Sequence, residues 1–314
     1  MTTTQLDRNQ QLRHLLTLEG IPRNEILDLL DRAAAISAGE IPHCGDFALA
    51  NIFCEPSTRT RATFELAAKR LGGHVINLDL GHASTSKGET LADTVATLHA
   101  AGCRLFVLRH SESGAAEHAA RVAPAGCAII NAGDGTHAHP TQALLDLYTM
   151  GRHFSRLADL RVTIVGDILH SRVARSLIHG LKRFDAAEIR LCGPATLLPE
   201  ASEFPGAHPY TDLDEAIHEV DVIYVLRLQR ERMHELLVPE KAQYRHCYGL
   251  TAERLQGAGT QCLVMHPGPL NRGVEIDSEV ADGPQSAILE QVGNGVPIRM
   301  AVMARLLESM GAGA

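Results

Sequence analysis

The run Ser57-Thr58-Arg59-Thr60-Arg61 carries residue types that bind phosphate. It lies where the apolar stretch 47–53 gives way to a helical pattern, so Ser57 and Thr58 fall at the positive end of a helix dipole. Arg59 can hold a phosphate through two hydrogen bonds, and the threonines add hydroxyl groups. The run predicts a phosphorylated ligand, although Ser-Thr before a helix is also an ordinary cap and Arg61 with Glu65 fits a surface pair.

A second run, His139-Pro140-Thr141-Gln142, places a histidine before a helical pattern. Proline favours the first position of a helix, so Pro140 predicts a helix that continues over residues 141–150. His139 then either takes part in chemistry or merely caps that helix. Each run alone leaves the choice open, whereas the two together favour an active site.

Both runs resemble the signatures of the carbamoyltransferase family, Ser-x-Arg-Thr-Arg and His-Pro-x-Gln, in the same order. The resemblance extends from near the N-terminus to Arg305. In segments 84–90, 131–135 and 266–273 it is closer to the aspartate-specific members. Ornithine-specific members carry His-Cys-Leu-Pro where this chain has His266-Pro267-Gly268-Pro269, so that thiol is missing here. The resemblance therefore implies aspartate as the amine acceptor.

The resemblance implies a reaction between carbamoyl phosphate and L-aspartate that uses no cofactor and no metal ion. The aspartate amine attacks the carbonyl carbon and the departing phosphate can accept the proton, so no covalent nucleophile is needed. Fixed hydrogen-bond donors stabilise the charge that develops on the carbonyl oxygen. The products are N-carbamoyl-L-aspartate and phosphate, in an early step of de novo pyrimidine (UMP) biosynthesis.

The carbamoyl phosphate site of the family matches residues in the first half of the chain. Arg109 matches the arginine that contacts the phosphate and the carbonyl group, and Thr60 and His139 match donors to the carbonyl oxygen. Gln142 matches the residue that holds the carbamoyl amide. The implied ligands are Ser57, Thr58, Arg59, Thr60, Arg109, His139 and Gln142. The implied catalytic residues are Arg59, Thr60, Arg109, His139 and Lys87.

Aspartate carries two carboxylates, so we expect cationic side chains in the second half of the chain. Arg172 matches the arginine for the α-carboxylate, although by position it could also be a surface residue at a helix N-terminus. Arg227 and Gln229 match the group that reaches the side-chain carboxylate. The substrate and product loop of the family matches Pro267, Gly268 and Pro269.

Lys87 is by composition an exposed loop lysine. The resemblance implies instead that its loop enters the active site of a neighbouring subunit and binds aspartate there, in a homotrimer with shared sites. The family has a serine a few positions before this lysine; Ser84 and Ser86 both fit, and we favour Ser86. Family trimers occur free, joined to regulatory chains or docked on a dihydroorotase-like partner, and the sequence does not choose among these.

Apolar runs with strand character alternate with helical patterns, which predicts parallel α/β layers. The predicted strands are 47–53, 75–78, 105–108, 128–130, 162–165, 188–191, 222–226 and 262–265. Ligands bind at the carboxyl ends of such strands, and the candidate residues follow them. We expect an α/β fold of two doubly wound parallel-sheet domains with the active site in the cleft between them. Loops are expected at 81–87, 199–209 and 233–250.

The resemblance also suggests how the chain is divided. We expect a carbamoyl-phosphate-binding domain at residues 1–150 and an aspartate-binding domain at residues 151–289. A C-terminal helix within residues 290–314 should pack back on the first domain.

Composition limits the remaining possibilities. A chain of 314 residues exceeds one usual core, and its apolar content of 45% is enough to fill two. A formal charge of −8 argues against nucleic acid or anionic lipid as a partner. The seven cysteines form no Cys-x-x-Cys pair, the N-terminus is polar and no long apolar run occurs, so we expect a cytoplasmic protein without a membrane span.

Two alternatives stay open. The chain could carbamoylate another amino acid, or it could be a catalytically silent homologue that serves as a scaffold. The scaffold alternative predicts lesions in the motif residues, and the motifs quoted above are intact.

Overall fold

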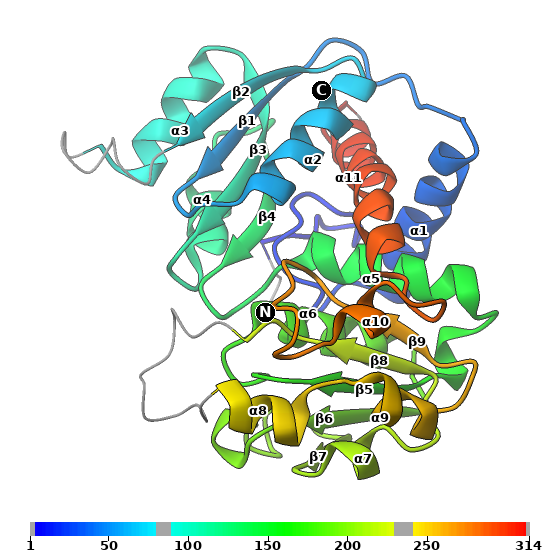
Figure 1. Cartoon of the computed structure of the whole chain (residues 1–314). Coiled ribbons are helices and arrows are strands. Elements are labelled where there is room, and N and C mark those ends of the chain that lie inside the picture. The colour runs from blue at the N-terminus through cyan, green and yellow to red at the C-terminus, as the bar shows by residue number, and fades with distance from the viewer. Residues whose placement is uncertain (1–3, 80–88, 229–240, 312–314) are drawn as a thin grey trace. The chain divides into compact units, whose positions relative to one another are not determined.

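The structure is a computed structural model that describes residues 4–79, 89–228 and 241–311. The chain forms two compact units, one of Met1–Tyr148 with Gly293–Ala314 and one of Thr149–Val292. Each unit contains its own parallel β-sheet with helices on both faces (Figure 1). The two sheets confirm the expected pair of doubly wound α/β domains.

The sheet of the first unit has four parallel strands in the order β2-β1-β3-β4. Its strands are β1 (Ala48–Phe53), β2 (His74–Asp79), β3 (Cys103–His110) and β4 (Ala128–Asp134). The chain passes from β1 outward to β2 and then returns to β3 on the other side of β1, so the direction of winding reverses between β1 and β3. β4 is buried at all seven of its residues, as is typical of a parallel strand covered on both faces.

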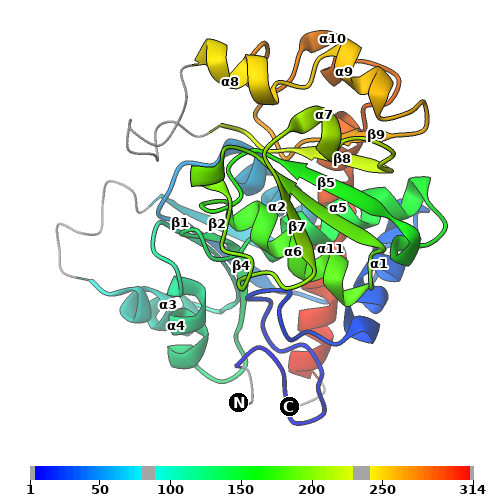
Figure 2. The same cartoon turned by 90° about the horizontal axis from the view of Figure 1, so that it is seen from below.

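Helices cover both faces of this sheet. The helix α2 (Thr58–Arg70) connects β1 to β2 on one face. The helices α3 (Leu91–Ala100) and α4 (Ala115–Val122) lie side by side on the other face (Figure 2), where their alanine and valine side chains complete an apolar core with β1 and β3. The unit also contains α1 (Arg23–Ser37), most of α5 (Pro140–His153) and most of α11 (Ile288–Gly311).

The sheet of the second unit has five parallel strands in the order β7-β6-β5-β8-β9. Its strands are β5 (Arg161–Val165), β6 (Glu188–Cys192), β7 (Ala207–Tyr210), β8 (Val222–Val225) and β9 (Leu263–Met265). Here the winding reverses between β5 and β8. The helix α6 (Arg172–Arg183) lies on one face of the sheet (Figure 1). The other face is covered by α7 (Leu213–Ala216), α8 (Lys241–Tyr248), α9 (Ala252–Gly257) and α10 (Ser278–Ala281).

Two of the expected loops contain regular structure. Residues 199–209 were expected to form a loop, but they enter the strand β7, whose edge position tolerates Pro209 because one side of an edge strand makes no ladder hydrogen bonds. Residues 233–250 were also expected to form a loop, but they include α8, whose Tyr244 and Tyr248 are spaced four apart and buried in the core. The expected loop at 81–87 lies outside the described residues. Within the described part of the chain, no helix has the length and apolarity needed to cross a membrane.

Candidate active site

The phosphate-loop sequence forms the start of α2. Ser57 is the N-cap residue, with an extended backbone, and the helix begins at Thr58. Thr90 and Ser171 cap other helices through their side chains, but the Ser57 side chain makes no capping bond within the part of the chain that the structure describes. An ordinary cap would accept an N–H of its own helix through this hydroxyl oxygen, and Ser57 does not do so here.

Arg109 lies beside this loop at the carboxyl end of β3. It is paired in register with Phe53, the last residue of β1, and its carbonyl oxygen accepts the N–H of Cys54 at 2.8 Å. Nη1 of Arg109 donates to the carbonyl oxygen of Ala132 at 3.2 Å. Nε lies 3.6 Å from Oε2 of Glu55, and both side chains are largely buried. The guanidinium is therefore held at the strand end where the phosphate loop begins.

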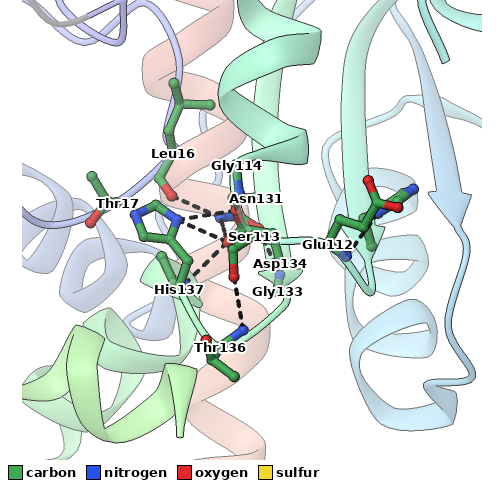
Figure 3. A network of polar contacts seen from close by, with 12 residues as sticks. Leu16, Thr17, Glu112, Ser113, Gly114, Asn131, Gly133, Asp134, Thr136 and His137 are labelled. Atoms are coloured by element: carbon green, nitrogen blue, oxygen red, sulfur yellow. Dashed lines mark hydrogen bonds and ion pairs between the residues drawn. The ribbon is translucent and has the colours of Figure 1, made fainter. Parts of the chain in front are cut away.

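Asp134 connects the segment after β3 to the segment that leads into α5 (Figure 3). Its carboxylate accepts the N–H of Gly114 at 2.7 Å, Nδ2 of Asn131 at 2.7 Å and the N–H of Ala138 at 3.1 Å. Nδ1 of His137 lies 3.0 Å from Oδ2. Burial raises the pKa of Asp134, but hydrogen bonds from His137 and Asn131 outweigh burial and hold the pKa below its usual range. The carboxylate therefore orders the turn that precedes His139.

A pocket of about 400 Å³ lies beside this network. Its wall includes Asn131, Asp134 and His137, together with Leu16 and Glu117. None of the predicted substrate ligands is among its lining residues in the described part of the chain. The pocket therefore lies against the end of β4, whose last residue is Asp134, and its lining differs from the set of predicted ligands.

His139 and Gln142 lie at the start of α5. His139 is 4% exposed and directly precedes the helix, and its carbonyl oxygen accepts the backbone N–H of Gln142 at 3.0 Å. The Gln142 side chain donates from Nε2 to Oδ1 of Asp146 at 3.0 Å. Thr60 is also buried, in the first turn of α2. The side chains of His139 and Gln142 therefore lie at the N-terminus of α5. This helix follows β4, the strand that pairs with β3, in which Arg109 lies.

In the second unit, Arg172 is the first residue of α6 and is only 5% exposed. Ser171 caps this helix by accepting the N–H of Ala174 at 3.1 Å. The alternative that Arg172 is a surface residue is therefore wrong. Arg227 is partly buried and lies two residues beyond the end of β8.

The Pro267-Gly268-Pro269 loop follows β9. Gly268 has a φ of +64°, a conformation that side-chain-bearing residues rarely adopt, and the peptide bond between Gly268 and Pro269 is cis. Nδ1 of His266 accepts the N–H of Gly268 at 2.8 Å, and His266 itself is buried 3.4 Å from Glu275. The loop backbone is thus fixed by a buried side chain.

In each sheet, the predicted cations lie on either side of the point where the winding reverses. Arg59 follows β1 and Arg109 is the second-to-last residue of β3, and the first sheet reverses between these strands. Arg172 follows β5 and Arg227 follows β8, and the second sheet reverses between those. Adjacent loops diverge at such a point and leave a crevice at the carboxyl edge of the sheet. Each unit therefore presents two arginines at the position where an open α/β sheet binds an anion.

Some predicted residues cannot be placed. Lys87, Gln229, Ser84 and Ser86 lie outside the described residues. Among the residues that are described, no cluster of histidine, cysteine, aspartate or glutamate could hold a metal ion.

The sequence interpretation missed three carboxylates, Glu55, Asp134 and Asp146, that contact predicted ligands or order their loops. Asp134 lies within the segment 131–135 noted in the sequence, and Asp146 lies four residues after Gln142 on one helix face, whereas Glu55 had no such signal.

Comparison with known families gives two matches that together cover most of the chain. Residues 13–152 match the family described as aspartate/ornithine carbamoyltransferase, carbamoyl-P binding domain. Residues 158–306 match the family described as aspartate/ornithine carbamoyltransferase, Asp/Orn binding domain.

Individual relatives are similar along nearly their whole length. The chain is 53% identical to the aspartate carbamoyltransferase catalytic subunit of Xanthomonas campestris pv. campestris (strain B100), over 98% of this chain and 100% of that one. Among solved structures, aspartate transcarbamoylase from Trypanosoma cruzi in complex with N-(phosphonacetyl)-L-aspartic acid aligns with a TM-score of 0.85 and 30% identity, covering 98% of this chain and 99% of that one. Ornithine carbamoyltransferase from Thermus thermophilus aligns with a TM-score of 0.84 and 27% identity, covering 94% of this chain and 99% of that one.

Proposed function

The chain belongs to the aspartate/ornithine carbamoyltransferase family, and we propose that it transfers the carbamoyl group of carbamoyl phosphate to the amino group of L-aspartate. It is a transferase, and the products of the proposed reaction are N-carbamoyl-L-aspartate and phosphate. The observation that carries the proposal is the pair of arginines at the reversal point of each sheet. The substrates carry three anionic groups between them, one phosphate and two carboxylates, so two separate sets of cations fit this pair of molecules.

On the carbamoyl phosphate side, we assign the phosphate to Ser57, Thr58 and Arg59 at the start of α2. Arg109 bridges the phosphate and the carbonyl oxygen, and Thr60 and His139 donate to that oxygen as its negative charge develops. Gln142 binds the carbamoyl amide. This proposal is supported by the order of the strands, which brings the ends of β1, β3 and β4 next to one another. The residues accelerate the reaction by orientation and fixed dipoles and form no covalent bond to the substrate.

On the aspartate side, we assign the α-carboxylate to Arg172 and the side-chain carboxylate to Arg227 and Gln229. The Pro267-Gly268-Pro269 loop lies at the carboxyl end of the neighbouring strand and contacts the acceptor. The position of Arg172 supports its role, because it is the first residue of α6, which follows β5 at the point where the winding of the second sheet reverses. The relatives that carry aspartate in their names support aspartate over ornithine, as does the absence of the cysteine motif.

We further propose that the chain works as a homotrimer in which Lys87 of one subunit completes the site of another. A regulatory chain or a dihydroorotase-like protein could join this trimer. We place the protein in the cytoplasm, in de novo pyrimidine biosynthesis. Its seven cysteines are free thiols, which fits a reducing compartment.

The test is an assay for the carbamoylated amino acid with purified protein, carbamoyl phosphate and either L-aspartate or L-ornithine. We expect product from aspartate and none from ornithine. Arg227→Ala should weaken the apparent affinity for aspartate by roughly 100-fold while the affinity for carbamoyl phosphate, measured by calorimetry, barely changes. Arg245→Ala is the matched control, because Arg245 in the same unit pairs on the surface with Asp277. The assignment of the acceptor would be refuted if the wild type preferred ornithine, or if Arg227→Ala bound aspartate with unchanged affinity.

A further inference from the structure

The first turns of α5 place the Gln142 amide against a buried carboxylate. Nε2 of Gln142 donates to Oδ1 of Asp146, which lies one helical turn further along and is fully buried. An ionised carboxylate offers only hydrogen-bond acceptors, so it must receive the N–H end of the amide. The carbonyl oxygen, Oε1, is therefore the end of the Gln142 amide that faces away from Asp146 and can meet a ligand.

A buried arginine supports the ionised state of this carboxylate. Arg299 of α11 is 3% exposed, and burial lowers its pKa to about 10 while the charge of Asp146 opposes that lowering. Arg299 is therefore still protonated at neutral pH and favours a negative charge on Asp146. Its guanidinium donates from Nη1 to the carbonyl oxygen of Gly295 at 2.9 Å and lies 4.8 Å from the ring centre of Phe64 in α2. These contacts fix the cation in place.

We infer that Asp146 is a positioning residue that holds the Gln142 amide in one orientation and so makes the site select a carbamoyl NH2 group over acyl groups without an N–H donor. The inference rests on the proposed function and concerns the specificity of the site that binds carbamoyl phosphate. Carbamoyl phosphate presents an NH2 group beside its carbonyl carbon, and Oε1 can accept from it. Acetyl phosphate has a methyl group of similar size at that place and gives Oε1 nothing to accept. If the amide were reversed, its NH2 would face the substrate NH2, and no hydrogen bond could form.

The test compares how the intact oligomer binds three ligands: carbamoyl phosphate, acetyl phosphate and inorganic phosphate. Dissociation constants are measured by calorimetry for the wild type and for Asp146→Asn. The asparagine amide can donate as well as accept, so it no longer dictates the orientation of Gln142. We expect the preference for carbamoyl over acetyl phosphate to fall about 5- to 10-fold, the equivalent of one hydrogen bond, while inorganic phosphate binds as before. Asp146→Ser, whose hydroxyl can also donate, replaces Asp146→Asn if that variant does not fold.

Two further variants separate orientation from a general structural effect. Gln142→Met removes the acceptor, so it should lower the preference by itself, and adding Asp146→Asn to it should lower the preference no further. Glu25→Gln is the matched control, because Glu25 is a buried carboxylate of the same unit that pairs with Arg305 at 3.0 Å. Its preference should equal that of the wild type.

The inference would be overturned if Asp146→Asn preferred carbamoyl phosphate over acetyl phosphate by a ratio within about twofold of the wild-type ratio. Equal weakening of all three ligands would do so too, because it would mean that Asp146 only supports the fold. Binding requires no turnover, so the inference and the proposed function fail separately. A protein that shows the expected preference but makes no carbamoyl aspartate would refute only the function.

Discussion

Nε of Arg109 lies 3.6 Å from Oε2 of Glu55, and the side chains of the two residues are only 14% and 16% exposed. This carboxylate balances a cation that we assign to the substrate phosphate. Removal of the arginine therefore has two consequences, a lost ligand and a largely buried carboxylate without this cation.

We expect Arg109→Ala to lower kcat by roughly 100- to 1000-fold, since it removes a donor to the developing charge. It should also lower the free energy of unfolding. The double variant Arg109→Ala/Glu55→Gln should recover stability in urea unfolding but not kcat in the carbamoyl aspartate assay. If the double variant regained activity, the arginine would serve only to neutralise Glu55.

The strands and the motif residues at their ends could be predicted because both signals are local. Apolar runs marked the central strands. Arg109 follows such a run directly, and Ser57 and His139 lie between such strands and the helices that come after them. The supporting carboxylates could not be predicted in the same way. Asp134 receives the N–H of Gly114, 20 residues away, and the charge of Asp146 acts on Arg299 in a helix at the far end of the chain. Such contacts depend on the order of strands and helices in space, which local residue patterns do not report.

The helix α8 was missed for a related reason. Tyr244 and Tyr248 are its only large apolar side chains, so its pattern resembles a loop until the core that buries the two rings is known. Tertiary burial, and not helix propensity, decides the structure of this segment.

Asp134 gives a prediction about acid stability. Its pKa is lowered in the folded state, so its contribution to stability is complete above the ordinary carboxyl pKa and is lost as the pH falls through the folded value. Asp134→Asn should cost roughly 2–3 kcal/mol at pH 7. In urea unfolding at fixed protein concentration, the gap between wild type and variant should narrow as the pH falls below about 4. A gap that stays constant down to pH 3 would mean that the carboxylate is not ionised in the folded protein.

His14 should also lose stability as the pH falls, because its pKa too is lowered in the folded state, but in a higher pH range. It is buried, its Nδ1 accepts the N–H of Ile129 at 3.0 Å, and burial followed by the charge of Arg13 lowers its pKa to about 4. As the pH falls below 6.5, the ordinary pKa of histidine, His14 becomes protonated in the unfolded chain but stays neutral in the folded chain. The wild type should therefore lose roughly 3 kcal/mol between pH 6.5 and pH 4, more than the variant His14→Asn. Equal slopes for the two proteins would contradict a buried, neutral His14.

Two glycines of α11 offer a matched pair of substitutions. A Cβ atom at Gly293 would meet nothing within 4 Å, so Gly293→Ala should stabilise the helix by up to about 1 kcal/mol. A Cβ atom at Gly295 would collide with Nη1 of Arg299. Gly295→Ala should therefore destabilise the protein in urea unfolding although it adds the same helix propensity. Equal stability of the two variants would show that the Arg299 guanidinium can move without cost.

The proposed shared site can be tested by mixing two inactive variants of the proposed trimer. If Lys87 acts in a neighbouring subunit while His139 acts in its own, Lys87→Ala and His139→Ala should each be nearly inactive. After the two are dissociated and reassembled together, some sites combine His139 from one chain with Lys87 from the other and are complete. A substantial fraction of activity should return in the mixture, but not when either variant is reassembled alone. Mass measurements that demonstrate subunit exchange without any return of activity would show that Lys87 acts within its own chain or has no role in catalysis.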